Sequence, residues 1–229
     1  YVTSGQSFRR PSPSELLAPG AVEAHVSARL EGDGRVVDGE LVATPEKRRF
    51  LRNGKPCRGQ DLSGTLLSIL FCPDDLSLVK GSASRRRGEL DSFGAQANVG
   101  YRKVLSAYTR SVEQRNRLLK DGCDDALLDA WDESVALGGA TLLHHRLNLF
   151  GRLSSLVSEV YAEVAGSEKL VCRYAPSVAG AEVGMGRDEL ARLMLEQMRS
   201  GRADDLRRAQ TLTGPHRDDV VFEIDGRDA

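Results

Sequence analysis

The sequence predicts an α/β protein, of the α+β kind, in which an antiparallel β-meander carries an inserted, elongated helical lobe. Three changes of pattern along the 229 residues indicate this fold. Residues 21–72 show the spacing and turn residues of short strands, residues 84–164 carry apolar side chains at helical spacing, and residues 170–224 return toward strands. A chain of this length holds one large domain or two small ones, so the pattern has to decide the division.

An antiparallel meander is expected from residue 21 to residue 72. Apolar and polar residues alternate over 22–30, and this period of two marks a strand with one buried face. A glycine-rich turn at 32–34 leads into a second strand at 36–42, and Asn53-Gly54 favours a hairpin between two shorter strands. Each strand is therefore expected to pair with the one before it.

An apolar run at 67–72 follows the meander and stops at Pro73. The run predicts a buried strand, which proline ends because it lacks the N–H group that a sheet needs. Asp74 and Asp75 come directly afterwards. Open α/β sheets bind ligands at strand C-termini, so these carboxylates are candidates to hold a metal, a water or a nucleotide oxygen. The alternative, which spacing alone favours, is that they cap a short helix at Leu76.

Helical spacing dominates from Ser84 onward. Ser84 is a candidate N-cap for a helix over 85–97, and a second amphipathic helix follows. Residues 125–164 keep an apolar stripe for so long that an unbroken helix would reach about 60 Å. A kink at Gly138-Gly139 or at Gly151 is therefore expected.

Strands return near the C-terminus, at 170–174 and 220–224, with helices expected at 187–198 and 204–208 between them. Just before the last strand, a helix-breaking pair and four polar side chains follow one another: Gly214, Pro215, His216, Arg217, Asp218 and Asp219. An ordinary loop has no need of this combination, so we expect a site that binds or senses something. The alternative is a turn in which a carboxylate pairs with the arginine or caps local backbone.

Composition indicates a soluble globular protein, with 40% hydrophobic and 28% charged residues. No apolar run is long enough to cross a bilayer and no signal-peptide core is present, so we expect a cytoplasmic protein without a membrane partner. The cysteines are scattered without a C-x-x-C pair, which argues against zinc and against a disulfide framework. His144 and His145 are adjacent on a helix, so their side chains diverge and no metal site is expected there.

The net charge of −1 gives no global attraction to nucleic acid. Any DNA contact must come from local patches, of which Arg85-Arg86-Arg87 and Arg207-Arg208 are the sharpest. The alternative for the triple arginine is a solvated helix face. The basic residues are mostly arginine, which suits bidentate contacts with phosphate or carboxylate, although a GC-rich genome gives the same bias.

Several short motifs occur in one order along the chain: Ser7-Phe8-Arg9, Lys80-Gly81 and Arg86-Arg87 within residues 73–91, Gln114-Arg115-Asn116, Trp131-Asp132, Arg146, and residues 205–208 running into 211–219. Together they resemble the RecF family of DNA replication and repair proteins, relatives of SMC- and ABC-type ATPases. The resemblance covers essentially the whole chain. It implies a partial ATPase head, with residues 1–78 and 209–229 in its β lobe and residues 79–208 in an inserted, mainly helical lobe.

The family also carries a phosphate-binding G-x-x-x-x-G-K-[ST] loop (Walker A), a signature segment and an Asp-rich Walker B strand, and these 229 residues contain none of them. A P-loop holds phosphates through backbone N–H groups and a lysine, and nothing here replaces it. The resemblance therefore implies the middle of a RecF-like protein, which binds ATP and Mg only at full length. Alone, this section is expected to bind no cofactor, to hold no catalytic residue and not to hydrolyse ATP. Ala83 stands where the family usually has proline.

Carried over residue by residue, the resemblance implies a nucleotide role for three side chains. Arg9 would reach nucleotide phosphate or sense DNA. Asp74 and Asp75 would face the Mg-nucleotide at a position similar to the ABC Q-loop, and would couple nucleotide state to rotation of the helical lobe.

The resemblance implies a different role for the basic residues that follow. Lys80, Arg86 and Arg87 would touch DNA or the facing subunit. Residues 214–219 would form a switch at the junction of the two lobes.

In the full-length protein the family implies a weak, DNA-dependent ATPase that forms a homodimer on binding ATP. The dimer would close as a clamp on gapped DNA at single-strand to double-strand junctions, and would help recombination mediator proteins to load recombinase. Hydrolysis would release it. The alternative, from another class, is an autonomous helical module that binds a protein partner and has no nucleotide cycle.

Overall fold

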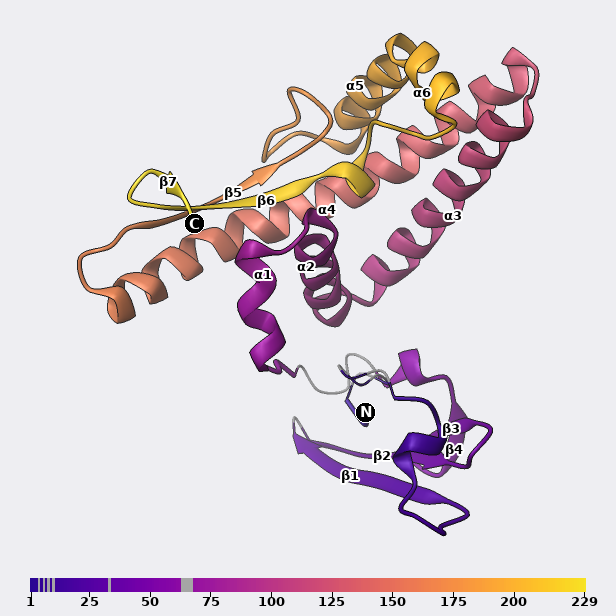
Figure 1. Cartoon of the computed structure of the whole chain (residues 1–229), viewed down its shortest axis with the longest axis vertical. Coiled ribbons are helices and arrows are strands. Elements are labelled where there is room, and N and C mark those ends of the chain that lie inside the picture. Colours follow the sequence, from indigo (N-terminus) through magenta and orange to yellow (C-terminus); the bar gives the residue numbers. More distant parts are fainter. Residues whose placement is uncertain (4, 6, 8, 10, 33, 63–67) are drawn as a thin grey trace. The chain divides into compact units, whose positions relative to one another are not determined.

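The computed structural model describes the chain apart from residues 4, 6, 8, 10, 33 and 63–67. Its contacts divide into two compact units (Figure 1). The first holds Tyr1–Phe71 with Ala95–Val99, and the second holds Cys72–Gly94 with Gly100–Ala229. No helix in the described part of the chain is both long enough and apolar enough to cross a bilayer.

The first unit is built on an antiparallel meander of the strands β1 (Ala24–Gly32), β2 (Arg35–Ala43), β3 (Arg48–Arg52) and β4 (Lys55–Cys57), which lie side by side in chain order. The predicted meander is therefore confirmed. Asn53 and Gly54 have φ values of 50° and 73°, the left-handed backbone that a two-residue hairpin turn requires.

The strand predicted over 67–72 is wrong for its described residues, 68–72, which form neither strand nor helix. Ile69, Leu70 and Phe71 are 87%, 61% and 75% exposed. A strand of this kind needs neighbouring strands to pair its backbone and cover its side chains, and the described sheets supply none here. Residue 67 lies outside the described residues. The chain continues through a 3₁₀ turn, Pro73–Leu76, into the one-turn helix α1 (Ser77–Lys80).

The second unit is mainly helical. Its helices are α2 (Ala83–Ala97), α3 (Val99–Asp121), α4 (Asp125–Ala165), α5 (Arg187–Ser200) and α6 (Arg202–Arg208). Figure 1 shows α3 and α4 meeting at one end and diverging toward the other. The helices predicted from residue 84 onward are all present.

Helix α2 begins one residue before the predicted N-cap. The carbonyl of Ser82, not Ser84, accepts from the backbone N–H groups of Arg85 and Arg86 at 3.0 and 3.3 Å. Ser84 lies within the first turn, and its assignment as the N-cap is wrong.

Helix α4 runs for 41 residues without interruption, and the kink expected at Gly138-Gly139 or Gly151 stays a prediction. Gly139 serves packing. A Cβ there would lie 2.6 Å from the sulfur of Met194 and 3.0 Å from Cε2 of Tyr108. The glycine lets α3 and α5 approach α4 closely.

A small antiparallel sheet packs along α4. It pairs β5 (Leu170–Ala175) with β6 (Asp219–Ile224), and β6 with the short β7 (Arg227–Asp228). Figure 1 shows β5 and β6 lying along the length of α4. The two predicted strands are confirmed.

The core beneath this sheet joins α2, α4 and β6. Leu90, Phe150 and Val220 are buried together, with partly buried apolar side chains around them: Leu149, Leu153, Cys172, Tyr174 and Phe222. Residues 209–229 thus pack within the second unit. Their assignment, with 1–78, to the β lobe of an ATPase head stays a prediction about the assembled head.

Candidate functional site

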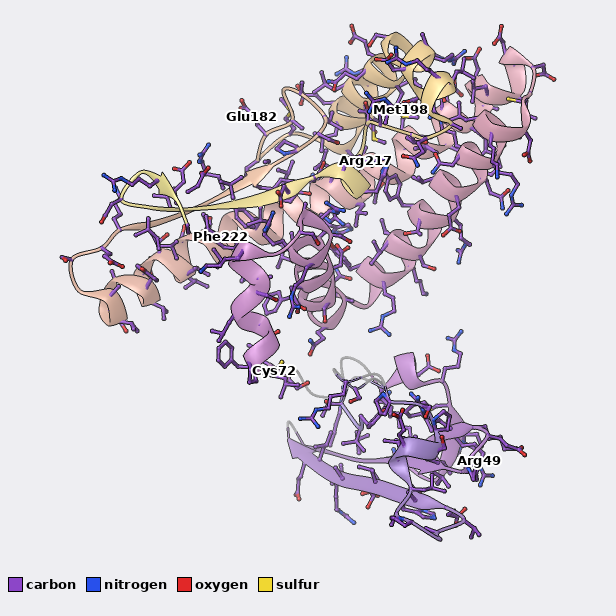
Figure 2. All side chains as sticks on the ribbon, in the orientation of Figure 1. Arg49, Cys72, Glu182, Met198, Arg217 and Phe222 are labelled. Atoms are coloured by element: carbon purple, nitrogen blue, oxygen red, sulfur yellow. The ribbon has the colours of Figure 1, made fainter. Side chains whose placement is uncertain are left out.

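The polar run identified in the sequence is contacted by several helices and a strand of the second unit. We call residues 211–219 the junction segment. It leaves α6, makes a 3₁₀ turn at Pro215–Arg217 and enters β6. Figure 2, in which Arg217 is labelled, shows the segment lying against α4. Side chains from α2, α3, α4 and β5 all reach it, as the contacts below show.

Gly214 sits at the tightest point of the junction segment. Its φ of 131° is one that L-residues rarely adopt, and a Cβ would lie 2.4 Å from the hydroxyl of Tyr108 and 2.7 Å from Cε of Met194. The Ser177 hydroxyl accepts from the N–H of Gly214 at 2.9 Å and donates to its carbonyl at 2.8 Å. Glycine is required here both by conformation and by space.

His216 is held between two fixed partners. Its Nε2 lies 2.9 Å from the carbonyl of Thr211, and its Nδ1 lies 2.7 Å from the hydroxyl of Tyr108. A carbonyl can only accept, so Nε2 carries the proton and Nδ1 accepts from the tyrosine. Burial lowers the pKa of His216 to about 4 and raises the pKa of Tyr108 far above its usual value. The imidazole is therefore neutral at physiological pH.

Arg146, on α4, ties the junction segment to α2. Its Nε and Nη2 donate to the two carboxylate oxygens of Asp91 at 2.9 and 2.8 Å, and its Nη1 donates to the carbonyl of Pro215 at 2.6 Å. The hydroxyl of Tyr101 donates to the same carboxylate at 2.5 Å. The arginine is only 2% exposed, so this bidentate pair is shielded from water and salt.

Asp218 anchors the segment to β5. Its carboxylate accepts from the hydroxyl of Tyr174 at 2.5 Å and from the N–H of Ser177 at 2.7 Å, and Arg146 lies 4.0 Å away. Burial raises the pKa of Asp218, against the opposing pull of these donors. The predicted alternative of a pair with Arg217 is absent, because Arg217 turns instead to Thr211 and Gln210.

A second buried arginine, Arg115 on α3, holds the start of the segment. Its Nε donates to Asp132 at 2.6 Å, and its Nη1 donates to Asp205 at 2.7 Å and to the hydroxyl of Thr211 at 2.9 Å. Asn116 accepts from the N–H and the hydroxyl of Thr211 at 2.7 and 2.8 Å. Arg115 and Asp132 are fully buried, and each has a second charged partner: Asp205 for the arginine and Arg202, at 2.6 Å, for the aspartate.

Arg86 and Arg87, predicted to touch DNA or a facing subunit, lie against the end of the junction segment. Arg86 makes a bidentate pair with Asp219 at 2.7 and 2.8 Å and donates to the carbonyl of Gly81 at 2.6 Å. This pair lowers the pKa of Asp219. Arg87 donates to the carbonyl of Asp218 at 2.6 Å. A contact between Arg86 and DNA stays a prediction, and it would require the guanidinium to leave these partners.

The other predicted site residues are Lys80, Asp75, Asp74 and Arg9. Lys80 is exposed at the end of α1. Asp75 accepts from the N–H of Cys72 at 2.8 Å and pairs with Arg85 at 3.4 Å, contacts that lower its pKa. The helix α1, which follows Leu76, has no side-chain cap among the described residues, so these contacts are not the cap that the alternative predicted. The side chain of Asp74 lies outside the described residues. Arg9, in the first unit, lines an open depression with Ser7, Pro11, Glu15 and Leu16.

The junction contacts were only partly foreseen. The sequence predicts either that Arg115, Asn116 and Asp132 are polar heads pointing outward from packed antiparallel helices, or that they belong to an arm that positions a clamp. The outward orientation is wrong for Arg115 and Asp132, which are buried. Tyr174, Ser177 and Asp91 were missed. One signal was available for α3, where Tyr101, Tyr108 and Arg115 recur every seven residues and therefore share one face of the helix.

Four elements hold the nine residues of the junction segment through neutral or mutually compensated groups. The described residues hold no cluster of side chains able to bind a metal ion. A displacement of the junction segment must move α3 and α4 or break several buried hydrogen bonds.

Known proteins with a similar sequence match this chain along its whole length. The DNA replication and repair protein RecF of Desulforudis audaxviator is 37% identical over 233 residues, which cover all of this chain and 63% of that protein. The RecF of Kineococcus radiotolerans is 35% identical over 250 residues, covering 100% of this chain and 64% of its own length. No family model matches the sequence.

Solved structures show the same backbone. A structure of the recombination mediator protein RecF-ATPrS in the RecFOR pathway superposes with a TM-score of 0.88 at 27% identity, covering 99% of this chain and 62% of that one. A RecF-ATP structure gives the same TM-score. The chain thus spans somewhat less than two thirds of the length of these relatives.

Proposed function

The chain belongs to the RecF family of DNA replication and repair proteins, and we propose that it forms the central part of an ATP-driven DNA clamp. In this proposal the whole protein binds ATP, dimerises on gapped DNA at single-strand to double-strand junctions, and helps mediator proteins to load recombinase. The similarity of the whole chain to RecF proteins solved with ATP or its analogue carries the proposal.

The residues described here do not by themselves fit a nucleotide. Both oxygens of Asp75 already have partners, Cys72 and Arg85. The depression that Arg9 lines also contains Glu15, whose carboxylate would repel phosphate. We therefore propose that ATP and Mg are held mainly by other parts of the whole protein, with Arg9 as an accessory contact, and we assign no chemical step to this chain.

The junction segment is the proposed relay of the clamp. Its grip on α2, α3, α4 and β5 supports this role, because a force applied at β6 would pass to the two longest helices through Arg146 and Arg115. Buried, paired contacts favour two discrete arrangements over gradual deformation. Residues 214–219 are then the switch at which nucleotide state would become helix movement.

The decisive experiment uses the whole protein and measures its affinity for gapped and for continuous duplex DNA, with and without ATP. We expect ATP to strengthen binding to gapped DNA at least about tenfold, a coupling in the usual range for linked sites, and to convert monomer to dimer in sedimentation. Identical affinities and a monomer in both conditions would refute the clamp and favour the autonomous module.

A further inference from the structure

The outer face of α3 carries a row of cations that none of the contacts above uses. Lys103, Arg110 and Arg117 recur every seven residues, so they lie in line along the helix, rotated by only about 20° from one to the next. All three are exposed. Figure 2 shows nitrogen-tipped side chains projecting from α3 on the side away from α4. We call these three residues the α3 ridge.

The ridge is the reverse side of the face that holds the junction segment. Tyr101, Tyr108 and Arg115 occupy positions two residues earlier in each heptad, about 200° around the helix, and are buried. The inner series fixes the rotation of α3, so the outer series cannot turn inward. The ridge is therefore held in place by the buried network.

Charge on this face differs from that of the chain as a whole. Around the ridge lie two further cations, Arg102 and Lys120, against two acids, Glu113 and Asp121, in a chain whose net charge is −1. In the part of the chain that the structure describes, the ridge side chains make no ion pair, and Arg110 donates to the hydroxyl of Ser106 at 3.0 Å.

Four of the more buried arginines of this unit each pair with at least one aspartate: Arg86, Arg115, Arg146 and Arg202. The ridge residues lack such a pair within the described part of the chain. Glu113 lies three residues from Arg110 and four from Arg117, yet pairs with neither among the described contacts. Their charge remains available to an external anion.

The length of the row points to a polymeric anion. Lys103 and Arg117 are fourteen residues apart, or about 21 Å along the helix, a length that matches roughly six base pairs of duplex. A small anion needs one concave site with convergent donors, whereas a convex row of separate cations suits a chain of phosphates.

We propose that the α3 ridge binds the sugar-phosphate backbone of DNA without reading its sequence. This rests on the proposed DNA function and locates its contact on a helix that the sequence did not suggest. Binding should release counterions and weaken with added salt. The ridge and the junction segment share α3, so a DNA contact here would bear directly on the helix that the relay moves.

The test uses the triple variant Lys103→Gln, Arg110→Gln and Arg117→Gln, because glutamine keeps helix propensity while removing charge. Binding of a fluorescent duplex by the whole protein would be measured from about 50 to 200 mM salt. We expect affinity at low salt to fall at least about tenfold, and the slope of log K against log salt to flatten by about two to three.

A matched control removes three exposed cations elsewhere in the second unit, through Lys169→Gln, Arg152→Gln and Arg192→Gln. It changes net charge equally and should retain most of the affinity and slope. Equal effects of the two triple variants would overturn the ridge as a site. The proposal would also be overturned if the ridge variant bound DNA as tightly as the unsubstituted protein does, even if the variant lost binding to an acidic protein.

These experiments can refute the proposed ridge and the proposed clamp independently. DNA binding that depends on the ridge but not on ATP would refute the clamp and keep the ridge. ATP-dependent binding that survives the ridge variant would keep the clamp and refute the ridge. Unchanged thermal unfolding of the ridge variant would show that its loss of binding is not a loss of fold, since exposed substitutions usually change stability by less than about 0.5 kcal/mol.

Discussion

Helix α3 carries arginines on both of its faces, and their surroundings differ. Arg115, on the inner face, is fully buried and bound to two aspartates and a threonine, whereas Arg117, two residues later, is exposed and has no ion pair among the described contacts. A buried guanidinium is a fixed part of the fold because removing it strands its partners. An exposed one contributes little to stability and remains free to bind.

The sharpest test of this contrast compares Arg115→Met with Arg117→Met. The first should reduce the free energy of unfolding by about 3–5 kcal/mol, because Asp132 and Asp205 lose a buried partner. The second should change it by less than about 0.5 kcal/mol. Urea unfolding measures both, and similar losses for the two variants would contradict the division of α3 into a structural and a binding face.

The inner face also demands glycine opposite Tyr108. Gly214→Ala should cost about 3 kcal/mol, from its backbone conformation and from the 2.4 Å approach of a new Cβ to the tyrosine hydroxyl. Gly138→Ala is the matched control, since its Cβ would meet the same tyrosine at an ordinary 3.8 Å. The control substitution should leave stability unchanged or raise it, because alanine has a higher helix propensity than glycine. Thermal unfolding separates the two.

Acid should loosen the inner face through His216. Its pKa is about 4 in the folded protein and 6.5 in a free chain, so between these values the unfolded chain binds a proton that the folded chain does not. Stability therefore falls as pH falls, by about 2 kcal/mol at pH 5 from this group. Between pH 7 and pH 5, the free energy of unfolding of His216→Gln should therefore drop by about 2 kcal/mol less than that of the unsubstituted protein.

Two further titratable groups, Asp218 and His25, have to be considered in that experiment. Asp218, whose pKa burial raises, acts with the opposite sign but is present in both proteins and cancels. His25→Gln is the control, because this exposed imidazole has its pKa raised, first by Glu23 and then by Glu40. It cannot reproduce the effect. An unchanged pH dependence in His216→Gln would show that the buried imidazole is not the acid-sensitive group.

Local patterns predicted most of the fold. Alternation over 22–30, the Asn53-Gly54 turn and the apolar stripe of α4 all depend on neighbours in sequence, and each became the expected element. The strand expected at 67–72 failed because it depends on flanking strands, which local pattern does not reveal. The same limit explains Gly139 of α4, where Met194 and Tyr108, from elsewhere in the chain, leave no room for a Cβ.

The candidate site was predictable as a place but not as a set of contacts. Glycine, proline and four polar residues in a row marked the junction segment. Its partners lie about 40 to 130 residues away in sequence, as with Ser177 for Asp218 and Arg86 for Asp219, and single-sequence reasoning gives no register between such distant elements. The sequence therefore predicts a contact of Arg86 with DNA or the facing subunit, and does not reveal that its guanidinium also fits an internal aspartate.

The exposed Ile69-Leu70-Phe71 run bears on how the protein behaves in a test tube. Three adjacent apolar side chains without a charge between them form the kind of β-prone stretch that nucleates aggregates. Asp75, just after it, is the sort of gatekeeper that slows such self-association. We therefore expect a chain of these 229 residues to self-associate increasingly as its concentration rises.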